Sequence, residues 1–151
     1  MSMFPHTVTV YNTVQETDPE TFEDTLTNYI TVLTGVLVDE TKAANVAESG
    51  LEGADAVNLY IPTDVTATDG VTGAEKTFVG PMEFWSAEDK SSIWTLSVDG
   101  NGGTSFFVRG TVVEETGTFE SINLLYDGVY NITKVDNKDF GNLSHWQVGG
   151  A

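Results

Sequence analysis

Polar and apolar residues alternate with a period of two in several parts of the chain, which is typical of β-strands that bury one face. In residues 6–11 (HTVTVY), His6, Val8 and Val10 lie on one face of an extended chain. Gly, Pro, Asn and Asp interrupt this pattern and indicate turns. The predicted strands are residues 6–11, 29–38, 55–61, 93–98, 105–114, 129–135 and 145–148.

The last two predicted strands form the clearest pair. In the second of them, Trp146 and Val148 share one face. Residues 136–142, which separate the two strands, are rich in Asn, Asp and Gly, and these residues favour turns. We therefore expect an antiparallel hairpin with a wide loop. Residues 149–151 (Gly-Gly-Ala) have little side chain to hold them, so we expect a flexible tail that is ordered only against a neighbour.

One segment has the spacing of a helix instead. Phe119, Ile122 and Leu125 recur three residues apart, as on one face of a short helix. Gly128 follows shortly after and favours an end to the helix. We expect one short helix over residues 118–127.

The segments between the predicted strands are long. Residues 12–27 are acidic and rich in Thr, so we expect a solvated loop in which Phe22 is a candidate anchor. Residues 63–74 show no persuasive period. Residues 77–85 (TFVGPMEFW) are apolar, but Gly80-Pro81 interrupts them, so any strand there is short or at a sheet edge.

These elements predict a mainly β fold, a small antiparallel β-barrel or a sandwich with long loops and one short helix. Gly35 and Gly110 lie inside predicted strands, where they favour the bends that a small barrel needs. The 151 residues suit a single domain, residues 1–151, with a long loop or hairpin insertion at about residues 63–103.

Charge limits the classes of partner. The formal net charge is −17, and no Lys or Arg precedes Lys42. Six basic residues cannot form a phosphate-binding stripe, so we exclude direct binding of DNA or RNA. The acidity fits a highly soluble chain, a salt-adapted or calcium-rich setting, or a wall that repels DNA. We find no apolar run long enough to span a membrane, no signal peptide, and no Cys for disulfides or thiolate metal sites.

Residues with possible chemistry are few, and each has a simpler structural explanation. His6 and His145 lie in strand patterns without a second ligand at metal-site spacing. Residues 99–103 (DGNGG) resemble the start of a calcium loop but lack its third oxygen ligand, which favours a β-turn. Clusters among 23 acidic residues are expected by chance. We therefore expect no catalytic residue, no cofactor and no metal site, and the chain is not expected to be an enzyme.

An apolar group around Gly80-Pro81 has two interpretations. It is either the core of a hairpin or an exposed anchor for a partner subunit, since aromatic residues and Met are enriched in interface cores. As candidate subunit-interface residues we take Phe78, Met82, Phe84 and Trp85.

Strand patterns over most of the chain resemble a known family of phage proteins. The segments that carry the resemblance are HTVTVY, LTGVLVDETKA, ADAVNLYIP, SFFVRGTVVE and the closing YNITKVDNKDFGNLSHWQVGG. Together they look like head-closure proteins, also called stoppers or head–tail connector proteins, of tailed bacteriophages and prophages of Gram-positive hosts. The long segment 63–103 departs from the minimal pattern of that family and leaves a tail-terminator or tail-completion protein as a close competitor.

The resemblance implies a structural protein of the virion neck, assembled in the host cytoplasm. Copies would form a ring, of six or twelve, between the portal or adaptor protein and the tail terminator or other tail proteins. The ring would retain packaged DNA, which passes its lumen without specific binding, and would dock the tail. A calcium-dependent carbohydrate-binding module is the competing hypothesis from a different class, and no membrane is implied.

Overall fold

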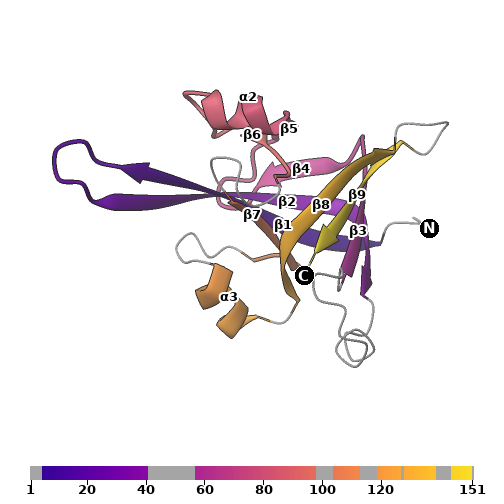
Figure 1. Cartoon of the computed structure of the whole chain (residues 1–151). Coiled ribbons are helices and arrows are strands. Elements are labelled where there is room, and N and C mark those ends of the chain that lie inside the picture. Colours follow the sequence, from indigo (N-terminus) through magenta and orange to yellow (C-terminus); the bar gives the residue numbers. More distant parts are fainter. Residues whose placement is uncertain are drawn as a thin grey trace.

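The computed structural model describes residues 5–40, 57–97, 104–112, 119–126, 128–138 and 144–150. The described part of the chain contains nine strands and two short helices (Figure 1). In chain order they are β1 (His6–Thr17), β2 (Asp24–Glu40), β3 (Val57–Pro62), β4 (Thr66–Asp69), β5 (Thr77–Phe78), α2 (Pro81–Ser86), β6 (Ile93–Trp94), β7 (Thr104–Arg109), α3 (Phe119–Leu125), β8 (Val129–Lys138) and β9 (His145–Gly150).

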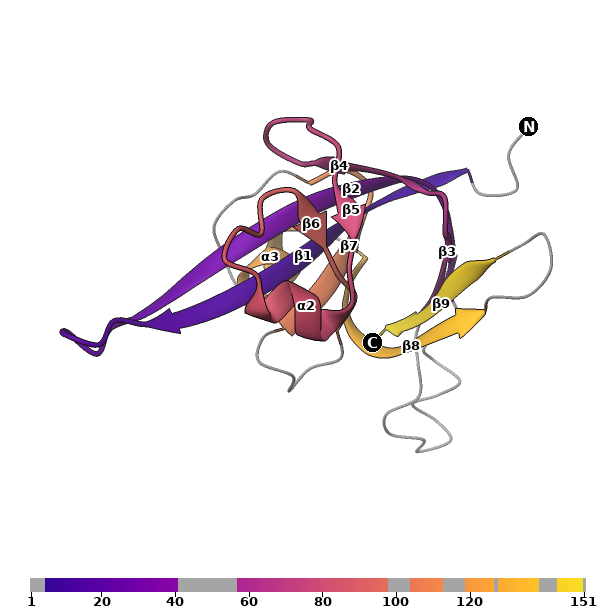
Figure 2. The same cartoon turned by 90° about the horizontal axis from the view of Figure 1, so that it is seen from above.

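Six of the strands close into an antiparallel barrel, which confirms the predicted fold class. The order is β1-β7-β8-β9-β3-β2, and pairing of β2 with β1 closes the ring (Figure 2). The strand β4 lies outside this ring and pairs only with β2. The predicted hairpin is present as β8 and β9. Closure leaves no free sheet edge along the ring itself, so the barrel offers few sites for strand addition.

The interior of the barrel is filled by apolar side chains from all six strands. The largest cluster of buried residues comprises Val8, Val10, Leu33, Val36, Val38, Val57, Leu59, Ile61, Ala67, Trp94, Leu96, Phe107, Ile132 and Val148. A second cluster lies on the other face of β1 and β7, where Tyr11 stacks on Phe106 and Ile122 of α3 packs. Both faces of β1 are therefore buried in part: Val8 and Val10 on one face, and Thr9 and Tyr11 on the other, are fully buried.

Two glycines expected inside strands have different roles. Gly35 has a φ of 90° and lies where the β1–β2 register shifts, between Thr34 and Val36. It is therefore the bulged residue at which β2 leaves β4 and turns to pair with β3. Gly110, with a φ of 93°, follows the last residue of β7 and ends that strand instead of bending it.

The predicted insertion has more regular structure than expected. Residues 63–74, expected to form a loop, contain β4, whereas in residues 77–85, where any strand was expected to be short or at an edge, only Thr77–Phe78 (β5) are extended, as expected. The short strand β5 pairs in parallel with β6, and residues 81–86 form the helix α2. Pro81 explains the change, because its fixed φ and missing N–H suit the first turn of a helix. The fold thus has a second short helix beside the predicted one, α3.

The expected flexible tail at residues 149–151 is wrong for its first two residues. Gly149 and Gly150 are buried and belong to β9, where they pair with β3 on one side and β8 on the other. A Cβ on Gly150 would lie 2.8 Å from Val57 Cγ1 and 3.0 Å from ring carbons of Phe107. The missing side chain therefore permits close packing and does not indicate freedom. Ala151 lies outside the described residues.

Candidate interaction surface

A two-stranded ribbon extends from the barrel where β1 and β2 outrun their other partners. Pairing of β1 with β7 involves Val8–Thr13, and pairing of β2 with β4 involves Thr31–Thr34. The β1–β2 ladder nevertheless continues to Thr17↔Asp24. We call residues 14–27 the β-arm; it projects from the body of the molecule in both views (Figures 1 and 2). The sequence predicted a loop here.

The turn at the end of the β-arm is tightly hydrogen bonded. The Asp18 N–H donates to the Glu23 carbonyl at 2.9 Å, and the Phe22 N–H donates to the Asp18 carbonyl at 2.8 Å. The Asp18 carboxylate accepts the Glu20 N–H at 2.8 Å. Phe22 has a φ of 58° and is 80% exposed. A bulky residue in the left-handed region is strained, and such strain is concentrated at functional positions.

The tip of the β-arm combines this apolar ring with negative charge. Asp18, Glu20 and Glu23 are exposed around Phe22, and neither Lys nor Arg occurs in residues 14–27. An exposed aromatic residue surrounded by carboxylates matches a partner surface that is apolar at its centre and basic at its edge.

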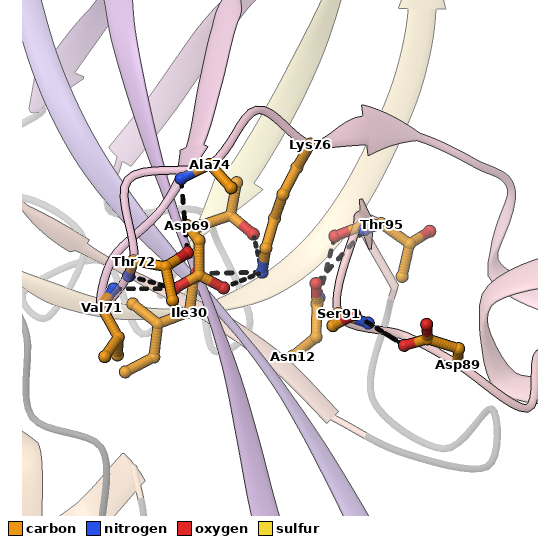
Figure 3. A network of polar contacts seen from close by, with 11 residues as sticks. Asn12, Ile30, Asp69, Val71, Thr72, Ala74, Lys76, Asp89, Ser91 and Thr95 are labelled. Atoms are coloured by element: carbon orange, nitrogen blue, oxygen red, sulfur yellow. Dashed lines mark hydrogen bonds and ion pairs between the residues drawn. The ribbon is translucent and has the colours of Figure 1, made fainter.

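Buried polar contacts fix the base of the β-arm on the side of β1. Asn12 is fully buried, and its Nδ2 donates to the Thr95 carbonyl and to Ser105 Oγ, both at 2.9 Å. Its Oδ1 accepts the Thr95 N–H at 3.2 Å (Figure 3). The Asn12 side-chain amide thus joins β1 to Thr95, which follows β6 within the insertion. It bonds both the N–H and the carbonyl of Thr95, as a neighbouring strand would.

A buried lysine fixes the base on the side of β2. Lys76 Nζ donates to the Ile30 carbonyl at 3.0 Å and to Thr31 Oγ1 at 3.1 Å, and lies 3.4 Å from Asp69 Oδ2 (Figure 3). Burial lowers the pKa of Lys76, and the charge of Asp69 opposes that shift. These three acceptors satisfy the ammonium group.

Asp69 is itself held by the chain that surrounds it. Its Oδ1 accepts the Val71 N–H at 2.8 Å and the Thr72 N–H at 3.0 Å. Burial alone would raise the pKa of Asp69, but these two backbone donors and Lys76 outweigh burial, so the pKa falls below its ordinary value. The Lys76–Asp69 ion pair therefore fixes the insertion on β2.

An aromatic contact also supports the base of the β-arm. Phe84 of α2 meets Tyr29 of β2 edge to face, with ring centroids 6.0 Å apart. Tyr29, Asn12 and Lys76 together place residues 63–97 against the base of the β-arm from both of its strands. The insertion expected as a loop is, in structural terms, a support for the β-arm.

A family model matches residues 3–151, which is nearly the whole chain. The chain belongs to DUF6751, a family of unknown function. No curated protein and no solved structure matches it.

In this DUF6751 chain the four candidate interface residues do not form one exposed surface. Phe84 is fully buried within the chain, so it is not available to a partner and that part of the prediction is wrong. Phe78 packs on the barrel core against Trp94. Trp85 is half-buried against Phe84, and its Nε1 is buried without a hydrogen-bond partner. Met82 is 87% exposed and alone among the four remains open to a partner.

Neither histidine is part of a metal centre among the described residues, where no group of three His, Asp or Glu side chains is placed to hold a metal ion. His6 Nδ1 accepts the Val38 N–H at 2.9 Å, and His145 lies beside the ring of Tyr60. The predicted turn at residues 99–103 lies outside the described residues.

Of the two helices described, neither is long and apolar enough to cross a membrane.

Sequence reasoning missed two features of this DUF6751 fold. The β-arm escaped notice because residues 14–27 carry no regular apolar alternation, although their four Thr residues and Val14 favour extended backbone. The outer face of α3 was also missed: Leu124 is 87% exposed and Leu125 67% exposed, while Ile122 is buried beneath them. Two adjacent leucines were the available signal, because one helix face cannot bury both.

Proposed function

We propose that this DUF6751 chain is a structural subunit of the phage neck, with copies arranged in a ring between the portal or adaptor and the tail. The observation that carries the proposal is the β-arm together with the contacts from residues 63–97 that support its base. A two-stranded ribbon is at best marginally stable alone in water, and this one is supported at its base by an entire insertion. Such a projection serves contact with another subunit.

Two further properties support the proposal. The closed barrel removes most open strand edges, so assembly through projections is the route left to the described surface. A charge of −17 per copy gives an assembled ring a strongly negative field, which keeps DNA from adhering as it passes. The resemblance of the strand segments to head-closure proteins points to the same place in the virion.

The test is deletion of the gene in the genome that encodes it, followed by electron microscopy of the particles. The proposal expects capsids that package DNA and then lose it, together with free tails of normal length. Expression of the intact chain in trans restores tailed particles. Capsids that keep their DNA and carry tails would overturn the proposal. Tails of irregular length beside full capsids would replace it with the tail-terminator alternative.

A further inference from the structure

The turn at the tip of the β-arm has a close counterpart elsewhere in the chain. The counterpart begins at Asp69, where β4 ends, as the tip begins at Asp18. In both turns the Asp N–H donates to the carbonyl of the fifth residue after it, at 2.9 Å from Asp18 and 2.7 Å from Asp69. The Asp carbonyl in turn accepts the N–H of the fourth residue after it, at 2.8 Å and 2.9 Å. The two turns therefore share one pattern of backbone hydrogen bonds.

Side chains repeat the match. In each turn the Asp carboxylate accepts the N–H of the second residue after it, which is Glu20 or Val71, at 2.8 Å. The third residue after the Asp is Thr in both turns, and its hydroxyl accepts the N–H of the second residue after it, at 3.4 Å for Thr21 and 3.3 Å for Thr72. The chain thus uses one turn design twice: an Asp, a Thr three residues later, and a residue of positive φ directly after the Thr.

The two turns differ at the residue of positive φ. The second turn has Gly73 there, with a φ of 77°, and the β-arm has Phe22, with a φ of 58°. Glycine adopts this conformation freely, whereas a Cβ makes it costly. The ring of Phe22 recovers little of this cost inside its own chain, because Phe22 is 80% exposed. Folding alone would therefore favour glycine at position 22, as it has at position 73.

We infer that Phe22 is the binding residue of the β-arm and that its ring packs against an apolar surface of a second copy. The inference rests on the proposed ring and names the residue through which the copies touch. A residue that breaks a local rule of folding without a gain inside the chain is typical of a functional position. Phe22 also offers the large apolar area that anchors of interfaces provide.

The direction of the β-arm explains why the ring meets another copy. The β1–β2 ladder runs without a shift from Thr7↔Thr34 to Thr17↔Asp24, so the barrel fixes the direction of the β-arm. In both views the tip lies far from the body of its own chain (Figures 1 and 2). The surface of a copy also offers apolar counterparts, because large apolar side chains are exposed at Val71, Met82, Leu124 and Leu125. A contact between two different surfaces of identical subunits closes into a ring when the rotation permits.

Two substitutions separate the ring of Phe22 from its backbone strain. Phe22→Gly removes both, and we expect it to raise the melting temperature by about 2–4 °C. We also expect it to weaken self-association by about tenfold or more, as loss of an aromatic anchor does, in sedimentation velocity at physiological ionic strength. Phe22→Ala keeps the strain, so it should weaken self-association to the same extent without the gain in melting temperature.

Gly73→Ala is the matched control in the second turn. Nothing lies within 4 Å of a Cβ at Gly73, so this substitution adds backbone strain alone. We expect it to lower the melting temperature by about 2–4 °C and to leave self-association unchanged. Phe22→Gly protein that associates like the wild type would overturn the inference, and so would a wild type that stays monomeric at every concentration. A lower melting temperature of Phe22→Gly would also overturn it, because Phe22 would then serve the fold.

Photo-cross-linking tests whether the contact is specific to position 22. The cross-linking residue p-benzoylphenylalanine replaces Phe22 in one protein and the exposed Glu75 in the control protein. After irradiation we expect several-fold more cross-linked dimer from position 22, with peptide mass spectrometry identifying the surface it contacts. Equal yields would overturn the inference. Because gene deletion tests the neck independently, failure here with DNA-losing capsids there would remove the contact and keep the proposed function.

Discussion

Lys76 shows how one residue holds two parts of the molecule together. Its ammonium group is removed from water and bonds to Ile30, Thr31 and Asp69, which spread over β2 and the end of β4. Burying an ammonium group is costly unless acceptors satisfy it. Here the acceptors come from the strand that continues into the β-arm, so the same bonds that make the burial tolerable fix the insertion on that strand.

Asp69→Asn is expected to lower the free energy of unfolding by about 1–3 kcal/mol, because a buried ammonium group loses its counter-charge. The measurement is urea denaturation at pH 7, followed by tryptophan fluorescence. Glu75→Gln is the control: Glu75 is exposed and adjacent to Lys76 in sequence, so its charge loss should have little effect. A decrease as large in the control would mean that general charge, and not the pair, is responsible.

The same pair predicts a pH dependence with a definite sign. The pKa of Asp69 in the folded chain is lower than its ordinary value of 3.8, so the folded state binds this proton less readily than the unfolded state. The stabilisation by Asp69 is therefore complete above pH 3.8 and is lost as the pH falls through the folded value. Unfolding midpoints of the wild type and Asp69→Asn should converge in acid below that pH; a gap that widens in acid would contradict the assignment.

Gly150→Ala is expected to destabilise the fold by about 1–3 kcal/mol, because the added methyl group overpacks the barrel core. Its Cβ would lie 2.8 Å from Val57 Cγ1. Gly80→Ala is the matched control, since nothing lies within 4 Å of a Cβ there; as the N-cap of α2, Gly80 should show only a small decrease. Thermal unfolding of both variants decides whether Gly150 is required for packing.

At the scale of elements, the β-arm and residues 63–97, which support its base, form one unit. The β-arm contributes Val14 at its base to the buried residues, but its tip is exposed. Its position depends instead on Asn12, Lys76 and Phe84, which anchor its two strands. Stability and projection are thus separated: the barrel core folds the domain, and the insertion orients the ribbon.

This separation predicts that the β-arm can be removed without unfolding the barrel. Thr13 and Asn28 are paired across the base, so residues 14–27 can be replaced by Asn-Gly, the preferred two-residue hairpin turn. We expect a melting temperature within a few degrees of the wild type and loss of self-association in sedimentation velocity. A variant that unfolds would show that the β-arm belongs to the folding unit; one that still assembles would remove its role in contact.

The predictability of these elements follows from which faces they bury. Strands such as β3 (Val57–Pro62) bury alternate residues, and the period of two therefore located them. Residues 14–27 carry no regular apolar alternation, so the period of two could not reveal the β-arm. Phe84 was predicted at an interface because an aromatic residue beside Pro81 fits either a surface or a core, and only the contact with Tyr29 decides between them. Gly150 was likewise predicted to be flexible because the sequence alone does not show that Val57 packs against it in the fold.

At the scale of the whole molecule, charge and assembly oppose each other. Each copy carries −17, so a ring of copies accumulates repulsion over distances of a Debye length, ~8 Å at physiological ionic strength. Long-range repulsion therefore dominates at low ionic strength, and an apolar contact, for which the exposed Phe22 of the β-arm is a candidate, must hold the subunits together.

Self-association of the purified chain is accordingly expected to increase as sodium chloride is raised from very low to physiological ionic strength, because screening reduces the repulsion between acidic copies. Sedimentation velocity at a fixed protein concentration measures the oligomer fraction.

Calcium chloride at equal ionic strength is the control that separates screening from a bound ion: a much larger effect of calcium would indicate a specific cation site and favour the calcium-dependent alternative. A decrease in assembly with added salt would show that ion pairs, not apolar contacts, carry the interface.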